Sequence, residues 1–400
     1  MPALPDPIIP KGFRAAATKS GVKPSGGLDL AVVVADVPCS AAGTFTTNRV
    51  CAAPVTWDRE RLPSRTIRAI VVNAGNANAA TGRVGAADVR RTAEAAAQAI
   101  GCRPEDVLVA STGVIGRHLP MDRLLAGLDV VLGQTTSDPS DFHLASQAIL
   151  TTDTRPKVVG ARERIGPADV ALFGFAKGAA MIGPKMATML AFLITDANVE
   201  PADLQAVLSE VVETSFNCVS VEGHTSTNDT VLLLASGLSG GEPLKGDGLA
   251  TFASMVDSAC ADLAKMIPAD GEGATHLITI DVEGCADREQ ARTVARAVAD
   301  SPLVKTAIHG ADPNWGRIVS AAGYSGVIFD EPQLSLWLNG VLLYESGTPL
   351  DFDAAAVSKN LRANRDTHVR LVFTLGDASI RFWTCDLTAE YVRLNADYTT

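Results

Sequence analysis

Short apolar runs, separated by polar and glycine-containing segments, recur along the first two thirds of the chain. Such runs are typical of fully buried β-strands, because a helix that crosses a membrane needs about 20 apolar residues in succession. Between the runs, apolar residues recur at helical spacing. The pattern predicts strands at 29–36, 66–72, 106–110, 169–176, 189–194 and 231–235, and helices at 86–100, 121–132, 201–216 and 249–267.

The pattern changes near residue 276. From there the sequence predicts strands at 276–282, 304–308, 317–322, 334–338, 368–374 and 378–384, around helices at 287–300 and 352–363. Strands and helices in such mixed order are typical of an α+β unit. A chain of 400 residues also exceeds what one hydrophobic core usually serves. We therefore predict an α+β protein with a larger unit at 1–282 and a smaller mixed unit at 283–400.

The charge and the cysteines limit the partners and the compartment. Lysine and arginine number 34 against 45 acidic residues, and the net charge of −11 disfavours nucleic acids and anionic membranes as partners. The seven cysteines are scattered and never in C-x-x-C spacing, which suits free thiols in a reducing compartment. The N-terminal residues lack the basic and apolar regions of a secretory signal, so we expect a cytoplasmic protein.

Several polar residues stand where buried strands begin or end. Thr188 stands at the head of the apolar run 189–194, and a β-branched residue there is most often an ordinary core residue. The 111–113 turn follows a predicted strand, and such a turn can leave backbone N–H groups free to point at an anion. Segment 151–154 is also a good helix-cap or turn sequence. Local sequence alone therefore does not separate structural from functional roles.

The segment 177–197, KGAAMIGPKMATMLAFLITDA, resembles the signature of the ornithine acetyltransferase, or glutamate N-acetyltransferase, family. The resemblance implies a chain that cuts itself between Ala187 and Thr188 and uses the freed N-terminal threonine as its acyl-accepting nucleophile. It also implies a layered αββα sandwich of the type found in N-terminal-nucleophile aminopeptidases, followed by a smaller C-terminal domain whose tail returns to the active site. The mature chains are then 1–187 and 188–400, assembled as an α2β2 heterotetramer.

Further segments resemble blocks of the same family, in the same order along nearly the whole chain. They are NAGNANAATG (73–82), STG (111–113), TTDT (151–154), AKG (176–178), VEGHTSTNDT (221–230), DGEGA (270–274), HGADPNWGR (309–317) and YVRLNADYTT (391–400). By resemblance, Thr112 and Gly113 form an oxyanion hole. The resemblance implies substrate contacts for Thr151, Lys177, Thr188, Glu272, Asn395 and Thr400.

An N-terminal threonine carries its own base, because its α-amine has a pKa of about 7.7–8.0 and lies beside the hydroxyl. In the family reaction Thr188 takes acetyl from N2-acetyl-L-ornithine, and the amine of L-glutamate then takes it from Thr188. The resemblance places this ping-pong reaction in the cyclic pathway of arginine biosynthesis, and it implies no cofactor and no metal. It leaves open whether acetyl-CoA is a second acetyl donor, which would make the enzyme bifunctional.

Two alternatives stay open at this point. A related N-terminal-nucleophile amidase or aminopeptidase would pass the acyl group to water. A binding protein that has lost catalysis is a second alternative, against which the retained Thr188 and Lys177 argue. The chain departs from the family pattern at Lys185, where relatives more often carry asparagine, and at Glu222 and His224. Lys185 leaves the efficiency of self-cleavage open, and no role is predicted for His224.

Overall fold

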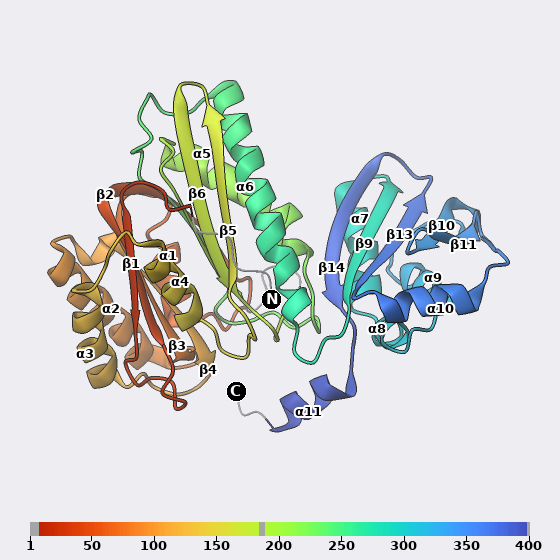
Figure 1. Cartoon of the computed structure of the whole chain (residues 1–400), viewed down its shortest axis with the longest axis horizontal. Helices are drawn as coiled ribbons and strands as arrows, with labels where there is room; N and C mark the ends of the chain where they lie inside the picture. Colours follow the sequence, from red (N-terminus) through yellow and green to blue (C-terminus); the bar gives the residue numbers. More distant parts are fainter. Residues whose placement is uncertain (1–7, 184–188, 398–400) are drawn as a thin grey trace.

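The computed structural model describes residues 8–183 and 189–397 (Figure 1). The predicted cleavage site at Ala187 and Thr188 and the predicted substrate contact Thr400 lie outside these residues. The strands of the first sheet are β1 (Phe13–Thr18), β2 (Leu30–Phe45), β3 (Ser64–Asn76), β4 (Val107–Val114), β5 (Lys157–Ile165), β6 (Ala168–Lys177), β7 (Leu190–Thr195) and β8 (Thr230–Ala235). They follow the order β4-β3-β2-β8-β7-β6-β5, with β1 paired to β2.

The first sheet is folded over so that its two halves face each other. The N-terminal part of β2 pairs with β3, and its C-terminal part, from Ser40 onward, pairs with β8. The register of β2 against β3 shifts on either side of Cys39, where the strand bends. One long strand therefore belongs to both halves and joins them at a corner.

Alternation along the strands separates the buried side chains into layers. In β7, Phe192 belongs to an apolar cluster shared with β1–β4, whereas Leu193 belongs to the cluster shared with the outer helices. In β4, Leu108 faces the first of these clusters and Val109 faces a third cluster on the opposite side. Because successive strand side chains point to opposite faces, strands buried on both sides read as continuous apolar runs. That is the pattern from which the strands were predicted.

Helices cover both outer faces of the folded sheet. They are α1 (Ala53–Arg59), α2 (Gly82–Ile100), α3 (Met121–Leu132), α5 (Pro201–Thr214) and α6 (Gly246–Met266), whereas α4 (Pro139–Ala148) packs into the apolar cluster between the two halves of the sheet. Helices α2 and α3 pack on one half, and α5 and α6 pack on the other half (Figure 1). The order of layers is helix, sheet, sheet, helix, which confirms the predicted αββα sandwich. None of the helices in the described part of the chain is long and apolar enough to cross a membrane.

The second unit has its own sheet, of order β12-β11-β10-β13-β9-β14. Its elements are β9 (Leu277–Cys285), α7 (Arg288–Ala299), α8 (Pro302–His309), α9 (Trp315–Gly323), β10 (Leu334–Leu338), β11 (Val341–Glu345), β12 (Thr348–Pro349), α10 (Ala354–Ala363), β13 (Asp366–Phe373), β14 (Ala378–Cys385) and α11 (Ala389–Asp397). The expected division after residue 282 falls inside β9, whereas the change of sheet comes before Leu277.

Two predictions in this unit are wrong, because 304–308 and 317–322 are helices rather than strands. The side chain of Ser301 caps α8 by accepting a hydrogen bond from the backbone N–H of Val304, and Asn314 caps α9 in the same way at Arg317. Caps of this kind satisfy N–H groups that have no partner inside the helix. Short apolar runs do not distinguish strand from helix, and here the capping residues decide.

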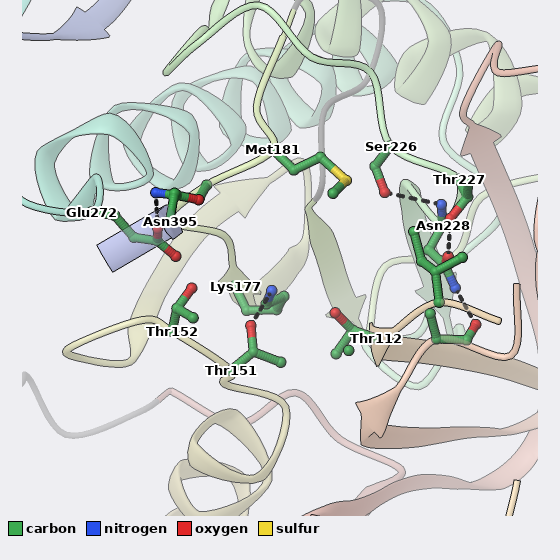
Figure 2. A pocket seen from close by; sticks show the side chains of 14 residues that line it. Thr112, Thr151, Thr152, Lys177, Met181, Ser226, Thr227, Asn228, Glu272 and Asn395 are labelled. Atoms are coloured by element: carbon green, nitrogen blue, oxygen red, sulfur yellow. Dashed lines mark hydrogen bonds between the residues drawn. The ribbon is translucent and has the colours of Figure 1, made fainter. Parts of the chain in front are cut away.

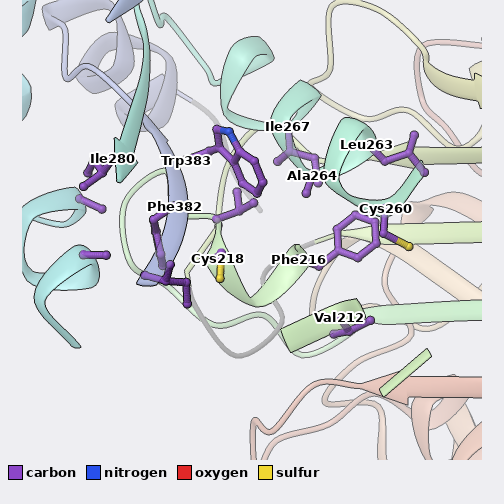
Figure 3. Packing of buried hydrophobic residues seen from close by; sticks show 14 of the residues in the cluster. Val212, Phe216, Cys218, Cys260, Leu263, Ala264, Ile267, Ile280, Phe382 and Trp383 are labelled. Carbon is purple, nitrogen blue, oxygen red and sulfur yellow. The ribbon is translucent and has the colours of Figure 1, made fainter. Parts of the chain in front are cut away.

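The two units share one apolar cluster (Figure 3). Phe216 and Cys218, which follow α5, pack beside α6 on one side and near Trp383 of β14 on the other. The backbone N–H of Ser220 donates to the carbonyl of Trp383 at 3.0 Å. The buried ammonium of Lys305 donates to the carbonyl of Val221 at 2.7 Å. These contacts hold segment 216–221 between the units, immediately before a loop that reaches the candidate site.

We expect Phe175→Ala to lower the free energy of unfolding by about 3–5 kcal/mol, because this fully buried ring lies between the two halves of the sheet. Its centroid is 5.3 Å from that of Phe192 and 6.0 Å from that of Phe173, so its loss leaves a cavity among aromatic neighbours. Urea denaturation measures the effect. The control Leu303→Ala, at a side chain with 60% exposure, should change stability by less than about 0.5 kcal/mol. Equal losses in both variants would contradict this layer assignment.

Candidate active site

A pocket with an empty volume of about 640 Å³ lies where several strands of the sandwich end (Figure 2). Every described residue among those predicted for the site lines it: Thr112, Gly113, Thr151, Lys177, Glu272 and Asn395. The other lining residues are Ala77, Ile115, Thr152, Ala180, Met181, Ser226, Thr227 and Asn228. Residues more than 280 positions apart in the sequence thus meet in one cavity, whereas their individual roles stay predictions.

Strand pairing brings the two sides of the predicted cleavage site to this pocket. Lys177, the last residue of β6, pairs with Leu190, the first residue of β7, and Leu190 pairs with Thr230 of β8. Met189 donates its backbone N–H to the Asp229 carboxylate at 3.2 Å. The chain on the C-terminal side of Thr188 is therefore fixed beside Lys177 and Asp229.

Thr112 and Gly113 lie at the end of β4, beside the last residues of β3. Gly113 has φ of +129°, and a Cβ atom there would come within 2.3 Å of the carbonyl carbon of Gly75. Both the conformation and the space require glycine at this position. The backbone of two segments can therefore approach closely at the wall of the pocket, which suits a site that uses backbone N–H groups.

Lys177 is buried, and its ammonium donates to the hydroxyl of Thr151 at 2.8 Å (Figure 2). The same nitrogen is 3.8 Å from the Asp153 carboxylate. Burial lowers the pKa of Lys177, although the charge of Asp153 opposes the shift. The pKa of Asp153 lies well below its ordinary value even though burial raises it, because Lys177 and Lys157 favour the carboxylate. The floor of the pocket thus holds buried charges of both signs.

Glu272 and Asn395 form one wall of the pocket. The side-chain amide of Asn395, in α11, donates to the Glu272 carboxylate at 2.8 Å. The backbone N–H of Glu272 donates to the carbonyl of Ala179 at 3.0 Å, which fixes the turn beside the segment that follows Lys177. The hydroxyl of Thr388 donates to the carbonyl of Gly273 at 2.9 Å. The C-terminal helix is therefore anchored to the turn that carries Glu272.

The pocket is also lined by three residues for which the sequence predicts no role, Ser226, Thr227 and Asn228. The side-chain amide of Asn228 donates to the carbonyl oxygens of Ala77 and Ser111, at 2.6 and 2.8 Å. It thereby ties the end of β4 to the loop after β3. The one signal in the sequence was the polar block 221–230, which stands directly before a buried strand.

Asp229, the residue that follows Asn228, is fully buried. One oxygen of its carboxyl group accepts the Met189 N–H, and the other has no hydrogen-bond partner within the described residues. Burial raises its pKa well above the ordinary value, against the opposing hydrogen bond from Met189. A buried carboxyl group therefore contacts the backbone of Met189, the residue that follows Thr188 in the sequence.

Glu222 holds the chain on the N-terminal side of the cleavage site. Its carboxylate accepts the backbone N–H of Ile182 at 2.5 Å, and the Ile182 carbonyl accepts N–H groups from Val221, Glu222 and Gly223. Burial raises the pKa of Glu222 to about 7. His224, the other departure from the family block, is exposed. Glu222, which departs from the family pattern, is thus a titratable group that holds the backbone at Ile182.

Comparison with known proteins finds relatives that match nearly the whole chain. The ArgJ family model matches residues 14–400. A protein of Rhodopirellula baltica, named arginine biosynthesis bifunctional protein ArgJ, is 44% identical over 98% of this chain and 97% of its own length. One of the same name from Thermus thermophilus is 47% identical over 98% of this chain and 99% of its own length.

A solved structure carries the same name. The crystal structure of the Bacillus halodurans protein is 40% identical with a TM-score of 0.50, and the match covers 51% of this chain and 96% of the solved chain. Fold and pocket together define an enzyme of the layered αββα class. The protein belongs to the ArgJ family.

We expect Glu222→Gln to make stability less dependent on pH. The pKa of Glu222 is about 7 in the folded protein against an ordinary 4.5, so the folded state binds more protons than the unfolded state. The contribution of Glu222 to the free energy of unfolding is therefore fully present below pH 4.5 and is lost as the pH rises through 7. Glutamine imitates the protonated form. Wild type and variant should unfold alike in urea at about pH 4, and the variant should be more stable at pH 8.5 by about 1–3 kcal/mol.

The matched control is Glu345→Gln, at an exposed position in the second unit. Its difference from wild type should be the same at both pH values. If Glu222→Gln also differs from wild type by a constant amount, Glu222 is not a titrating anchor of segment 181–183.

Proposed function

We propose that this protein transfers the acetyl group of N2-acetyl-L-ornithine to L-glutamate, by way of an acetyl ester on Thr188, in arginine biosynthesis. The observation that carries the proposal is the meeting of Thr112, Gly113, Lys177 and Glu272 in one pocket beside Met189. The relatives that match nearly the whole chain are named for arginine biosynthesis. These names favour acetyl transfer over the hydrolytic alternative, in which water takes the acyl group.

The charges of the pocket suit an acetylated amino acid with a second cationic group. N2-acetylornithine carries a carboxylate and a side-chain ammonium. The ammonium of Lys177 can bind the carboxylate, and the carboxylate of Glu272 can bind the ammonium. Asn395 holds Glu272 at 2.8 Å and so keeps its carboxylate in place. Thr151 holds the Lys177 ammonium at 2.8 Å on the opposite side.

The first half-reaction forms the acetyl ester. The α-amine of Thr188 takes the hydroxyl proton as the oxygen attacks the acetyl carbonyl, with Thr112 and Gly113 as donors to the oxyanion. One such donor is worth about 2.7–4 kcal/mol in related acyl transfers. The C–N bond breaks, and the nitrogen leaves as the amine of ornithine after it receives the proton. In the second half, the amine of glutamate attacks the ester and releases the Thr188 hydroxyl.

We also propose that Thr188 becomes N-terminal by self-cleavage. The Thr188 hydroxyl attacks the Ala187 carbonyl, the acyl group moves from nitrogen to oxygen, and water hydrolyses the ester to give chains 1–187 and 188–400. The Bacillus halodurans chain, which matches 51% of this chain with 96% of its length, is about as long as one such product. An α2β2 heterotetramer in the cytoplasm belongs to the same proposal.

Acetyl-CoA is a second acetyl donor in this proposal. The relatives are named bifunctional, and acetyl transfer from a thioester to glutamate uses the same Thr188 ester. The reaction needs no further catalytic group, because only the leaving group differs. The C-terminal residue Thr400 belongs to the substrate site in the proposal, as the family resemblance implies, together with Asn395 in α11.

We expect Thr188→Ala to give one uncleaved chain without transferase activity, because neither acyl shift nor acetyl ester can form. Loss of this hydroxyl and methyl should cost about 1–2 kcal/mol of stability, so the variant folds. Thr188→Ser keeps the oxygen but loses the methyl that restricts χ1, so it should cut slowly and retain reduced activity. Intact-mass spectrometry and a glutamate acetylation assay measure both effects.

The acetyl-enzyme itself provides the direct test of the proposed function. Wild-type protein incubated with labelled N2-acetylornithine and no glutamate should carry one acetyl group on the peptide that begins at Thr188, and addition of glutamate should remove it. Label on another residue, or glutamate acetylation by Thr188→Ala, would refute the mechanism. Release of labelled acetate without transfer to glutamate would point instead to the hydrolase.

We expect Lys177→Met to lower kcat/KM for N2-acetylornithine by about 10–100-fold, because a charged hydrogen bond to substrate is worth about 1.5–3 kcal/mol. Methionine retains the apolar stem. Asp153 keeps its hydrogen bonds from Lys157 and Gly178, so stability should change little. Steady-state kinetics and urea denaturation measure the two quantities. Lys359→Met, at an exposed position of α10, is the control, and equal loss of stability and activity in Lys177→Met would assign Lys177 a structural role.

A further inference from the structure

A second pocket lies between α1 and α2, with an empty volume of about 1370 Å³. We call it the basic pocket. Its lining includes Trp57, Glu60, Arg61, Arg90 and Arg91. Three guanidinium groups thus line the pocket in a protein with a net charge of −11. That of Arg61 lies 3.5 Å from the Glu60 carboxylate, and that of Arg91 lies 3.8 Å from the Asp88 carboxylate. A local excess of positive charge in an acidic protein favours an anionic ligand at this place.

The arrangement of these groups suits a nucleotide with phosphates. The Arg61 guanidinium lies 3.3 Å from the centroid of the Trp57 ring, and that of Arg90 lies 5.9 Å from it. The Arg61 Nε is buried and has no hydrogen-bond partner within the described residues. Planar guanidinium groups bind phosphate oxygens in pairs, and they also stack on the rings of bases. Arg90 and Arg91 are exposed, so they remain accessible to phosphates.

The basic pocket is adjacent to the candidate active site. Ala77 lines the active-site pocket and Ala80 lines the basic pocket, and three residues of chain span at most about 11 Å. The backbone N–H of Ala52 donates to the carbonyl of Thr227, at the active-site wall, at 2.9 Å. Its neighbours Cys51 and Ala53 line the basic pocket. The two pockets are therefore adjacent, with the small buried cluster of Ala52, Val55, Ala77 and Ala79 beside both.

We propose that the basic pocket binds the adenosine 3′,5′-diphosphate half of acetyl-CoA while the acetyl thioester reaches Thr188. This rests on the proposed use of acetyl-CoA. The pantetheine arm has as many main-chain bonds as four residues, so it extends about 13 Å and can bridge the two pockets. The Thr188 oxygen forms a bond to the acetyl carbon, the C–S bond breaks, and the hydroxyl proton passes through the α-amine to the sulfur, which leaves as a thiol.

This location explains how one nucleophile can serve two donors of different size. N2-acetylornithine has no nucleotide, so its recognition uses the active-site pocket, through Lys177 and Glu272. Acetyl-CoA carries several negative charges, which Arg61, Arg90 and Arg91 can neutralise. Substitutions in the basic pocket should therefore affect one half-reaction and leave the other intact.

The test is the double variant Arg90→Ala/Arg91→Ala, compared with Arg362→Ala at an exposed position of α10. Both positions are helical and exposed, and alanine favours helix, so folding is retained. Calorimetric titration with coenzyme A should show at least about a tenfold loss of affinity in the double variant and none in the control. The KM for acetyl-CoA should rise in parallel, whereas kcat and KM for N2-acetylornithine with glutamate should not change.

Three results would overturn the assignment. They are a double variant that binds coenzyme A as tightly as wild type, a wild type that binds no coenzyme A, and a wild type that binds pyrophosphate as tightly as coenzyme A, which would indicate a general anion site. Activity with N2-acetylornithine is measured in the same preparations. Its retention in any of these cases would separate failure of the basic pocket from failure of the proposed function.

Discussion

The candidate site depends on a group of charges that are buried under it. Asp153 accepts from Lys157 at 2.7 Å, Lys157 also donates to Asp270 at 2.7 Å, and Lys177 lies 3.8 Å from Asp153. Buried ions lose the hydration of water, so such a cluster is stable only where each charge keeps at least one close partner. It therefore fixes three chain segments at one point: the loop before β5, the end of β6 and the turn that leads to Glu272.

The residues of the pocket above these charges come partly from strand ends of the first sheet and partly from segments outside that sheet. Strand ends supply Thr112, Gly113 and Lys177, and their positions follow from the hydrogen bonds of the sheet. Glu272 lies on a turn between the two units, and Asn395 arrives on the last helix. The second unit thus contributes to the site through its C-terminal helix, and its packing through Trp383 and Ser220 keeps that helix within reach.

The sequence predicted β2–β4 and β6–β8 of the sandwich because these strands have buried segments that read as apolar runs. The prediction was wrong at α8 and α9, where the caps at Ser301 and Asn314 favour helix over strand, and the sequence did not reveal β1, β5, β11, α1 or α4. The family blocks identified the described residues that share the pocket. The sequence predicted no role for Asn228, because its partners Ala77 and Ser111 are 151 and 117 positions away and only the fold brings them together.

The position of residue 188 between β6 and β7 has a consequence for the order of events. These two strands are antiparallel neighbours in the middle of one sheet, and β8, from the later part of the chain, inserts between β7 and β2. A cut at this place leaves two chains that share a continuous hydrogen-bonded sheet. Assembly must therefore be complete before the cut, while both parts are still one molecule. After separation in denaturant, the two fragments must associate in a bimolecular reaction, whereas the intact chain folds in a unimolecular one. The proposed cleavage would thus follow a folding reaction that the two separated chains cannot easily repeat.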